Sequence, residues 1–408
     1  LSSLPGTLSD PAAAWPASDR HRLPGPIGFY AVVAAVLGCL VVAGLAAARL
    51  ARRGPWSSHA GRGESGARWG QARDLRALVV RGAQPGRLTL GRLGRRLVAT
   101  EPRASTIVIG PSQSGKTAGL AIPAILEAAG PVLAVSVKRD LLDHTLAARS
   151  SCGEVWIYDP TGAAQLDDER AVGWDPVRSC VEWADARRMA HNLTSAQAAS
   201  GSRDAEFWLQ MATKLLAPLL LAAAGKIDGS MRDVVAWVDS GEQTAVAELL
   251  QDLGEPDAHA AFAATCRREE RTLSSVYATT EAVLAPFAAP AVLASPGDHG
   301  IDTETLLEGR GTLYVVAPAK DQERLAPLFA GLVEHLVDAA YARAAAGRPC
   351  NPSLLVVLDE AANTAPIRNL PQIAATAAGQ GIQVVTVFQD LAQARSRYGE
   401  AADTILAN

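Results

Sequence analysis

Short apolar runs recur along the chain, and glycine, proline or polar residues separate them. The runs that have the length and composition of buried β-strands are Thr106–Ile109, Val132–Val137, the stretch GEVWIYDPTG with its strand ending at Asp159, Gly311–Ala319, Leu354–Leu358 and the final stretch GIQVVTVFQ. Helical periodicity lies between several of them, at Ala118–Ala128 and from Arg324 to about Ala346. This alternation of strands and helices predicts an α/β fold with a parallel sheet.

The strand pattern is interrupted from about Asp175 to Pro296, where helical patterns dominate. In DAEFWLQMATKLLAPLLLAAAG, large apolar residues recur at helical spacing and predict a packed core face: Trp208, Met211, Leu215, Leu216 and Leu219. We interpret this region as an all-helical insertion. Arginines 267, 268 and 271 cluster on one of its helices, and they fit either a solvated face or a contact with DNA.

A long apolar run lies near the start of the chain. Pro26–Ala48 carries no charged residue and matches the roughly 20 residues needed to span a bilayer. Arginines 49, 52 and 53 follow at once, which predicts that everything after this run lies in the cytoplasm. The run is too long for a cleaved signal peptide, and its basic flank is on the wrong side. A buried core helix is the alternative reading.

These patterns predict six segments. They are an extracytoplasmic segment (1–25), a transmembrane helix (26–48), a linker (49–66), the first part of a nucleotide-binding domain (67–176), an all-α domain (177–296) and the second part of the nucleotide-binding domain (297–408). Because the chain begins with Leu1 rather than Met, we expect that the start of a longer protein is missing.

Composition narrows the class of protein. The 408 residues carry a net charge of −4, so nucleic-acid binding would need local basic patches or a pore formed by several subunits. The five cysteines lie far apart without a C-x-x-C pair, which argues against a zinc site or a disulfide framework and fits a reducing compartment.

The loop after the first predicted strand matches the spacing G-x-x-x-x-G-K-[ST]. Its candidate nucleotide-binding residues are Gly110, Pro111, Ser112, Gln113, Ser114, Gly115, Lys116, Thr117 and Ala118. Such a loop wraps backbone N–H groups around phosphate oxygens. Lys116 is expected to reach the β- and γ-phosphates of ATP, and the Thr117 hydroxyl is expected to bind Mg²⁺. The strand-loop-helix setting favours this function over a chance loop.

An acidic pair supplies the second half of the predicted site. Asp359 and Glu360 end the strand Leu354–Leu358, which we expect beside the phosphate-loop strand. There Asp359 is expected to hold Mg²⁺ through water, and Glu360 to polarise the water that attacks the γ-phosphate. Gln389 ends the last strand, where it is either a sensor of the γ-phosphate or an ordinary surface glutamine. The predicted catalytic residues are thus Glu360, Gln389 and Lys116, and the predicted metal-binding residues are Thr117 and Asp359.

With these motifs, residues 26–408 resemble the type IV coupling proteins of conjugative DNA transfer, the TraG- and TraD-like group. The stretches that carry the resemblance are ARWGQARDLRAL, GPSQSGKT, SVKRDLLDHT, WDP at 174–176, DAEFWLQMATKLL, GTLYVVAP, LLVVLDEAAN and GIQVVTVFQDLAQARSRYG. The residues of the phosphate loop, the acidic pair and Gln389 match the family's functional positions. Lys138 and Asp140 fall in a further motif of the family without an assigned role.

The resemblance implies a RecA-like P-loop ATPase with an inserted all-α domain, using ATP and Mg²⁺. It implies a homo-hexameric ring anchored in the cytoplasmic membrane, with its ATPase domain in the cytoplasm. The implied partners are single-stranded, relaxase-bound DNA, the relaxosome and components of the secretion channel. Two alternatives remain: a docking receptor for protein substrates that uses ATP as a switch, and a membrane-tied translocase of double-stranded DNA.

The sequence also departs from the family pattern. Many relatives place an arginine shortly before the glutamine strand, where a neighbouring subunit's phosphate is within reach. Here ATAAGQGIQ has no basic residue, and Arg368 and Arg395 are the candidates left for that role. The resemblance also implies an incomplete C-terminal end, since this chain stops at TILAN and relatives continue through further strands.

Overall fold

The computed structural model describes residues 9–11, 15–20, 24–53, 74–162, 170–197, 203–294 and 300–407, without the side chains of residues 43–53, 203, 294 and 319. The contacts group residues Leu1–Gln71 and Ala72–Asn408 as two separate units. Most of the predicted extracytoplasmic segment and residues 54–66 of the predicted linker lie outside the described residues.

The described part of the first unit contains one helix, α1 (Pro26–Arg53), where the sequence predicts a membrane span. Pro26–Val42 is its apolar part with described side chains, and they are exposed at positions such as Ile27 (89%) and Val42 (65%). Two longer apolar helices occur in the second unit, Asp204–Ala224 and Gln322–Ala345, but 61% and 72% of their spans are buried, as in core helices. The predicted helix is therefore present, and its insertion in a membrane stays a prediction.

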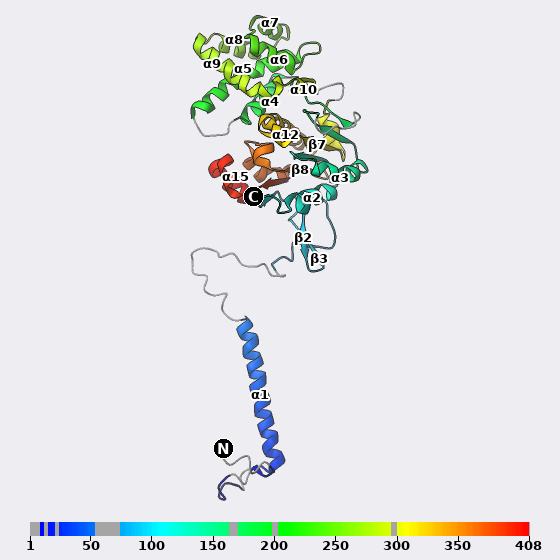
Figure 1. Ribbon diagram of the computed structural model, residues 1–408, viewed down its shortest axis with the longest axis vertical. Helices are drawn as coiled ribbons and strands as arrows, with labels where there is room; N and C mark the ends of the chain where they lie inside the picture. Colours follow the sequence, from blue (N-terminus) through cyan, green and yellow to red (C-terminus); the bar gives the residue numbers. More distant parts are fainter. Residues whose placement is uncertain are drawn as a thin grey trace. The chain divides into compact units, whose positions relative to one another are not determined.

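The second unit contains two sheets and most of the helices (Figure 1). Its strands are β1 (Val79–Val80), β2 (Thr89–Leu93), β3 (Arg96–Ala99), β4 (Thr106–Ile109), β5 (Val132–Ser136), β6 (Val155–Tyr158), β7 (Thr312–Val316), β8 (Leu354–Leu358) and β9 (Ile382–Phe388). Its helices are α2 (Ile122–Glu127), α3 (Asp140–Ser150), α4 (Trp183–Ser195), α5 (Arg203–Ala224), α6 (Met231–Ser240), α7 (Thr244–Asp252), α8 (Pro256–Cys266), α9 (Glu270–Leu284), α10 (Pro290–Ala294), α11 (Thr303–Glu308), α12 (Gln322–Ala345), α13 (Ala361–Thr364), α14 (Leu370–Thr376), α15 (Leu391–Tyr398) and α16 (Ala402–Ala407).

The larger sheet is parallel throughout, in the order β4-β9-β8-β5-β7-β6. Every residue of β5, β7, β8 and β9 is buried, which requires cover on both faces of the sheet. Alternate residues of β5 face opposite ways: Val132 and Ala134 join the cluster that contains residues of α2 and α3, whereas Leu133 and Val135 join the cluster that contains residues of α12 and α5. The predicted parallel α/β sheet is confirmed.

The strand order corrects one expectation. The acidic strand β8 is expected from the sequence to lie beside the phosphate-loop strand β4, but β9 pairs with both and lies between them. Buried parallel strands all carry similar apolar patterns, so local sequence does not encode which of them are neighbours. The consequence is that Gln389, at the end of β9, lies between the ends of β4 and β8.

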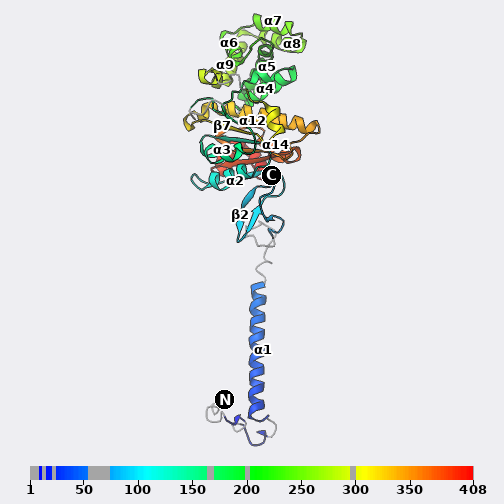
Figure 2. The ribbon, with the colours of Figure 1, turned by 90° about the vertical axis from the view of Figure 1, so that its right-hand side faces the viewer.

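Between β6 and β7 the described residues form helices, and their only β-pairing is the isolated bridges at Ala171 and Gly173. Helices α6 to α9 pack against α5, on the far side of α12 from β7 and β8 (Figures 1 and 2). The predicted core stripe on α5 is confirmed: Met211, Leu215, Leu216 and Leu219 are buried and Trp208 packs against the same cluster. Because that cluster also includes strand residues, the status of 177–296 as a domain of its own stays a prediction.

A buried arginine ties α3 to the N-terminal edge of the sheet. Arg149 is 1% exposed and donates to Thr312 Oγ1 at 2.7 Å and to the carbonyls of Ala128 (2.6 Å), Gly130 (3.0 Å) and Arg310 (2.9 Å). Burial lowers the pKa of this guanidinium. The loops before β5 and β7 are thus held to one helix by four hydrogen bonds from a single side chain.

Replacing Arg149 with methionine removes these donors and leaves buried carbonyls without partners. We expect the free energy of unfolding to fall by about 2–5 kcal/mol in urea titrations. Arg324→Met is the control, because Arg324 forms an exposed pair with Asp321 and should change stability by less than about 1 kcal/mol. Equal effects of the two substitutions would contradict this role of Arg149.

Candidate nucleotide-binding site

The predicted phosphate loop connects β4 to a helical turn that begins at Thr117 and continues into α2. Its two glycines are required for different reasons. A Cβ at Gly110 would lie 2.9 Å from Ser114 Oγ and 3.4 Å from the Lys116 side chain, so a larger residue there would force the Ser114 hydroxyl to move. Gly115 has φ +82°, a backbone conformation that other residues adopt only with strain. Both glycines allow the tight turn of the loop.

Lys116 lies over this loop. Its Nζ donates to the carbonyl of Pro111 at 2.7 Å and to that of Gly110. These carbonyls hold the ammonium group within the loop, where a phosphate oxygen can replace them as its partner. The position agrees with the predicted role of Lys116 as a phosphate ligand.

The two halves of the predicted site meet at one hydrogen bond. Thr117 Oγ1 donates to Asp359 Oδ2 at 3.0 Å, although 242 residues separate them in the sequence. Asp359 is fixed on its strand, because its N–H donates to Val135 O and its carbonyl accepts from Thr364 Oγ1, both at 3.0 Å. Asp359 is 5% exposed, and burial raises the pKa of its carboxyl while the hydrogen bond from Thr117 opposes that rise.

Oxygen ligands of this kind suit Mg²⁺, which takes one or two protein groups and completes its shell with waters and phosphates. Among the described residues, no cluster of three or more histidine, cysteine or acidic side chains is placed to hold a metal alone. The Thr117 hydroxyl and the Asp359 carboxylate fit a Mg²⁺ ion whose other ligands are waters and phosphates.

Glu360 has an unusual backbone. It adopts φ 55° and ψ 49°, the left-handed region, immediately after β8 and before α13. Residues with a side chain enter this region at a cost of about 1–3 kcal/mol and do so most often at functional sites. The strain turns the chain sharply at the sheet edge and leaves Glu360 half-buried next to Asp359.

Gln389 follows β9 directly, and its neighbour contacts the phosphate loop: the N–H of Gly110 donates to Phe388 O at 3.2 Å. The backbone N–H of Gln389 donates to Gln393 Oε1 at 3.0 Å, while Asp390 caps α15 by accepting from the N–H of Gln393. Gln389 therefore lies at the same sheet edge as the loop, and the function of its side chain stays a prediction.

Two residues linked to the site only by resemblance lie close to it. Lys138 and Asp140 follow β5, which pairs with β8, and both charges act on Asp359: Asp140 raises the pKa of that carboxyl and Lys138 lowers it. The buried Asp140 Oδ1 has no hydrogen-bond partner among the described residues. In the sequence, the signal that could identify these two residues is a pair of charged side chains directly after a buried strand.

The candidates for an intersubunit arginine have other contacts here. Arg368 Nη2 lies 2.7 Å from Glu206 Oε1, and Arg395 Nη2 lies 3.8 Å from Asp403 Oδ1. Both are exposed, and neither makes a hydrogen bond or ion pair with Lys116 or Asp359. Their predicted role stays a prediction.

The sequence analysis missed a junction between the acidic strand and the helices. The segment 365–369, which follows α13, is held by Arg397 Nη2, which donates to Pro366 O at 2.9 Å and to Ala196 O at 3.0 Å. Glu334 accepts from Ser195 Oγ at 3.0 Å and from backbone N–H groups of the same segment. In the sequence, the signal that could identify this junction is a single charged residue on an otherwise apolar helix face, as at Glu334.

Comparisons with known proteins agree with this architecture. A parallel sheet with a phosphate loop facing an acidic strand end defines a P-loop nucleotide-binding fold. The family model described as "Type IV secretory system Conjugative DNA transfer" matches residues 71–408, and the chain belongs to this family.

Individual relatives are more distant. The chain is 25% identical over 309 residues to the VirD4 proteins of Rhizobium rhizogenes and of Rhizobium radiobacter. The aligned region is 72% of this chain, but the chain spans only 44% and 43% of those proteins.

Solved structures of the conjugative coupling protein TrwB share the fold. The unbound form has a TM-score of 0.61 at 20% identity, covering 80% of this chain and 71% of that one. The TrwB complex with ADP and Mg²⁺ has a TM-score of 0.56 at 21% identity, covering 75% and 68%.

Glu334 generates a pH prediction. Burial raises the pKa of its carboxyl from 4.5 to about 7, so the folded state binds this proton more tightly than the unfolded state. The contribution of Glu334 to the free energy of unfolding is therefore fully present below about pH 4.5. It is lost as the pH rises through about 7, which lowers the free energy of unfolding by about 3 kcal/mol. Urea titrations should show this loss in the unsubstituted protein and a much smaller one in Glu334→Gln, which stays neutral. Glu323→Gln, exposed on the same helix, is the control and should retain the full loss; parallel pH curves for all three proteins would contradict the prediction.

Proposed function

We propose that this protein is a membrane-anchored ATPase that recruits relaxase-bound, single-stranded DNA and moves it toward a type IV secretion channel. The observation that carries the proposal is the hydrogen bond between Thr117 and Asp359, which joins an intact phosphate loop to the acidic end of β8. Family membership and the nucleotide complexes of TrwB support the same reading.

ATP would be held by the loop amides and by Lys116, which exchanges its contacts with the Gly110 and Pro111 carbonyls for phosphate oxygens. Thr117 and Asp359 would hold Mg²⁺, which when bound neutralises charge on the β- and γ-phosphates. Asp359 must be ionised in that state, and the cation offsets the burial that raises its pKa.

Glu360 would orient and deprotonate the attacking water, since it is half-buried next to Asp359 at the strand end that meets the phosphate loop. Gln389, between the ends of β4 and β8, would sense the γ-phosphate. A movement of the acidic pair would be transmitted through the 365–369 segment to α4 and α5. Arg397 and Glu334 bind this segment to the end of α4.

The larger assembly rests on the family. We propose a RecA-like core with α4 to α10 as an inserted all-α domain, assembled as a homo-hexamer on the cytoplasmic side of the inner membrane. Residues 26–48 would form the anchor and residues 1–25 the extracytoplasmic segment. Relaxase, relaxosome and channel components would be its partners.

A basic cavity in the helical region supports DNA over a protein cargo. It has a volume of about 880 Å³ between α4, α5 and α8, and its lining includes Arg187, Lys214, Arg268 and His191. Trp183 is also part of the lining, with the Arg187 guanidinium 6.0 Å from its ring centroid. Basic groups beside an aromatic ring are the combination that binds a single strand through phosphates and stacked bases.

Nucleotide binding is tested by calorimetry with MgATP on the full chain in detergent. Lys116→Ala should weaken binding at least about tenfold, because the ammonium is lost from the phosphates. Glu360→Gln should bind normally and lose hydrolysis by about a hundredfold or more. Lys214→Ala, a change of the same kind on α5, should alter neither. Unchanged MgATP affinity in Lys116→Ala would exclude this loop as the site.

DNA coupling is tested by ATP hydrolysis with single-stranded DNA, double-stranded DNA or none, at several salt concentrations. We expect single-stranded DNA to stimulate hydrolysis several-fold, with salt weakening the effect as phosphate contacts are lost. Greater stimulation by duplex DNA would favour a double-stranded DNA translocase. Hydrolysis indifferent to all DNA, together with protein cargo recovered after nuclease treatment, would favour a docking receptor for proteins.

A further inference from the structure

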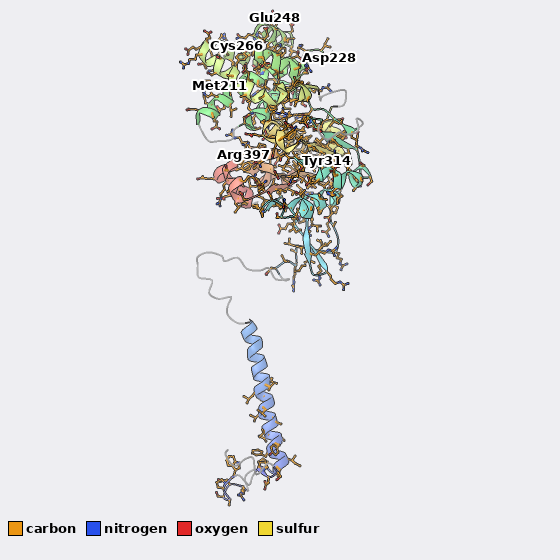
Figure 3. All side chains as sticks on the ribbon, viewed as in Figure 1. Met211, Asp228, Glu248, Cys266, Tyr314 and Arg397 are labelled. Carbon is orange, nitrogen blue, oxygen red and sulfur yellow. The ribbon has the colours of Figure 1, made fainter. Side chains whose placement is uncertain are left out.

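A basic β-hairpin lies at the start of the second unit, outside the nucleotide site. The antiparallel strands β2 and β3 are joined by a two-residue turn at Gly94 and Arg95, and β1 completes a small sheet. The β2–β3 ribbon extends away from the helices that cover the larger sheet (Figures 1 and 3). Residues 74–103 contain seven arginines against Asp74 and Glu101, in a chain whose net charge is −4.

Six of these arginines are exposed and make no ion pair with a described residue: Arg76, Arg81, Arg92, Arg95, Arg96 and Arg103. Elsewhere in the second unit many arginines pair with acids, as Arg343 does with Glu304 and Glu308. The seventh arginine is structural, since Arg87 donates to Thr100 O at 2.6 Å and to Ala77 O at 3.0 Å. The hairpin therefore has a fixed base and an unneutralised tip.

Leucines alternate with the arginines at the tip. In the strand register Leu93 pairs with Arg96 and Arg92 pairs with Leu97, so each face of the ribbon presents a leucine beside an arginine. Leu90 and Leu93 are 42% and 41% exposed, whereas Leu88 at the base is buried against the main sheet. Exposed aliphatic groups beside long cationic side chains suit a membrane interface, where the leucines enter the acyl boundary and the guanidinium groups reach headgroup phosphates.

We propose that the tip of this hairpin, residues 90–96, docks on the anionic surface of the membrane that holds α1. The proposal rests on the membrane anchoring in the proposed function. Residues 54–73 join Arg53 at the end of α1 to the described hairpin region, so the chain limits their separation to roughly 70 Å. Such a tether raises the effective concentration of the hairpin at the lipid surface, and acidic lipids of a cytoplasmic leaflet attract basic segments.

The residue types favour lipid over nucleic acid. Single strands are bound by stacking on aromatic rings, and residues 74–103 contain no phenylalanine, tyrosine or tryptophan. The leucines would have no partner on a phosphate backbone, but they gain by leaving water at a bilayer.

The test uses the full chain in lipid nanodiscs of phosphatidylcholine, with and without phosphatidylglycerol, and measures amide hydrogen exchange. We expect peptides from residues 89–99 to exchange about tenfold more slowly when phosphatidylglycerol is present, and high salt to remove this protection. The triple variant Arg92→Gln, Arg95→Gln, Arg96→Gln should lose it, with exchange in β5 and β8 unchanged. The matched control Arg267→Gln, Arg268→Gln, Arg271→Gln removes the same charge from the helical region and should retain it.

Equal exchange in both lipids, or protection that persists in the hairpin triple variant, would overturn the proposal. Protection by single-stranded DNA in phosphatidylcholine discs, lost in that variant, would instead identify a nucleic-acid surface. If the chain inserts into phosphatidylcholine discs but phosphatidylglycerol does not protect the hairpin, the membrane anchor is supported and the hairpin proposal is contradicted. If the chain fails to insert into those discs but phosphatidylglycerol protects the hairpin, lipid binding by the hairpin is supported and the membrane anchor is contradicted.

Discussion

The hydrogen bond from the Thr117 hydroxyl to the Asp359 carboxylate connects the two parts of the chain on which the proposed chemistry depends. It forms because the strands are parallel: β4 and β8 run in the same direction, so the loop that follows one meets the acidic pair that follows the other. The sheet must be buried on both faces to hold this edge, and the two hydrophobic clusters on either side of β5 provide that cover. A solvent-exposed carboxylate would lack this fixed position.

The residues of the candidate site were identified from short local signals. The glycines and lysine of the loop, the acidic pair after an apolar run and the glutamine at the last strand end each have a residue pattern that reflects backbone or charge requirements. The neighbours of each strand were not predictable, because β5, β7, β8 and β9 are uniformly apolar and their order depends on packing with helices far away in the sequence. The insertion of β9 between β4 and β8 is the result of that packing.

Buried and half-buried charges were harder still to predict. Arg149, Glu334 and Arg397 sit on helices whose sequence gives no sign that their partners are backbone groups of distant segments. Each satisfies carbonyl or N–H groups where the chain leaves a strand or a helix, so these side chains fix loops rather than pair with opposite charges. Through Glu334 and Arg397, the segment after the acidic pair is bound to the end of α4, which gives the candidate nucleotide site a physical connection to the helical region.

The most direct measurement is an experimental structure of the full chain with Mg²⁺ and a non-hydrolysable ATP analogue. The account predicts the triphosphate within the 110–118 loop and Mg²⁺ between Thr117 and Asp359, with Lys116 moved from the Gly110 and Pro111 carbonyls onto phosphate oxygens. A nucleotide bound elsewhere, with Lys116 still on those carbonyls and Thr117 still donating to Asp359, would contradict it.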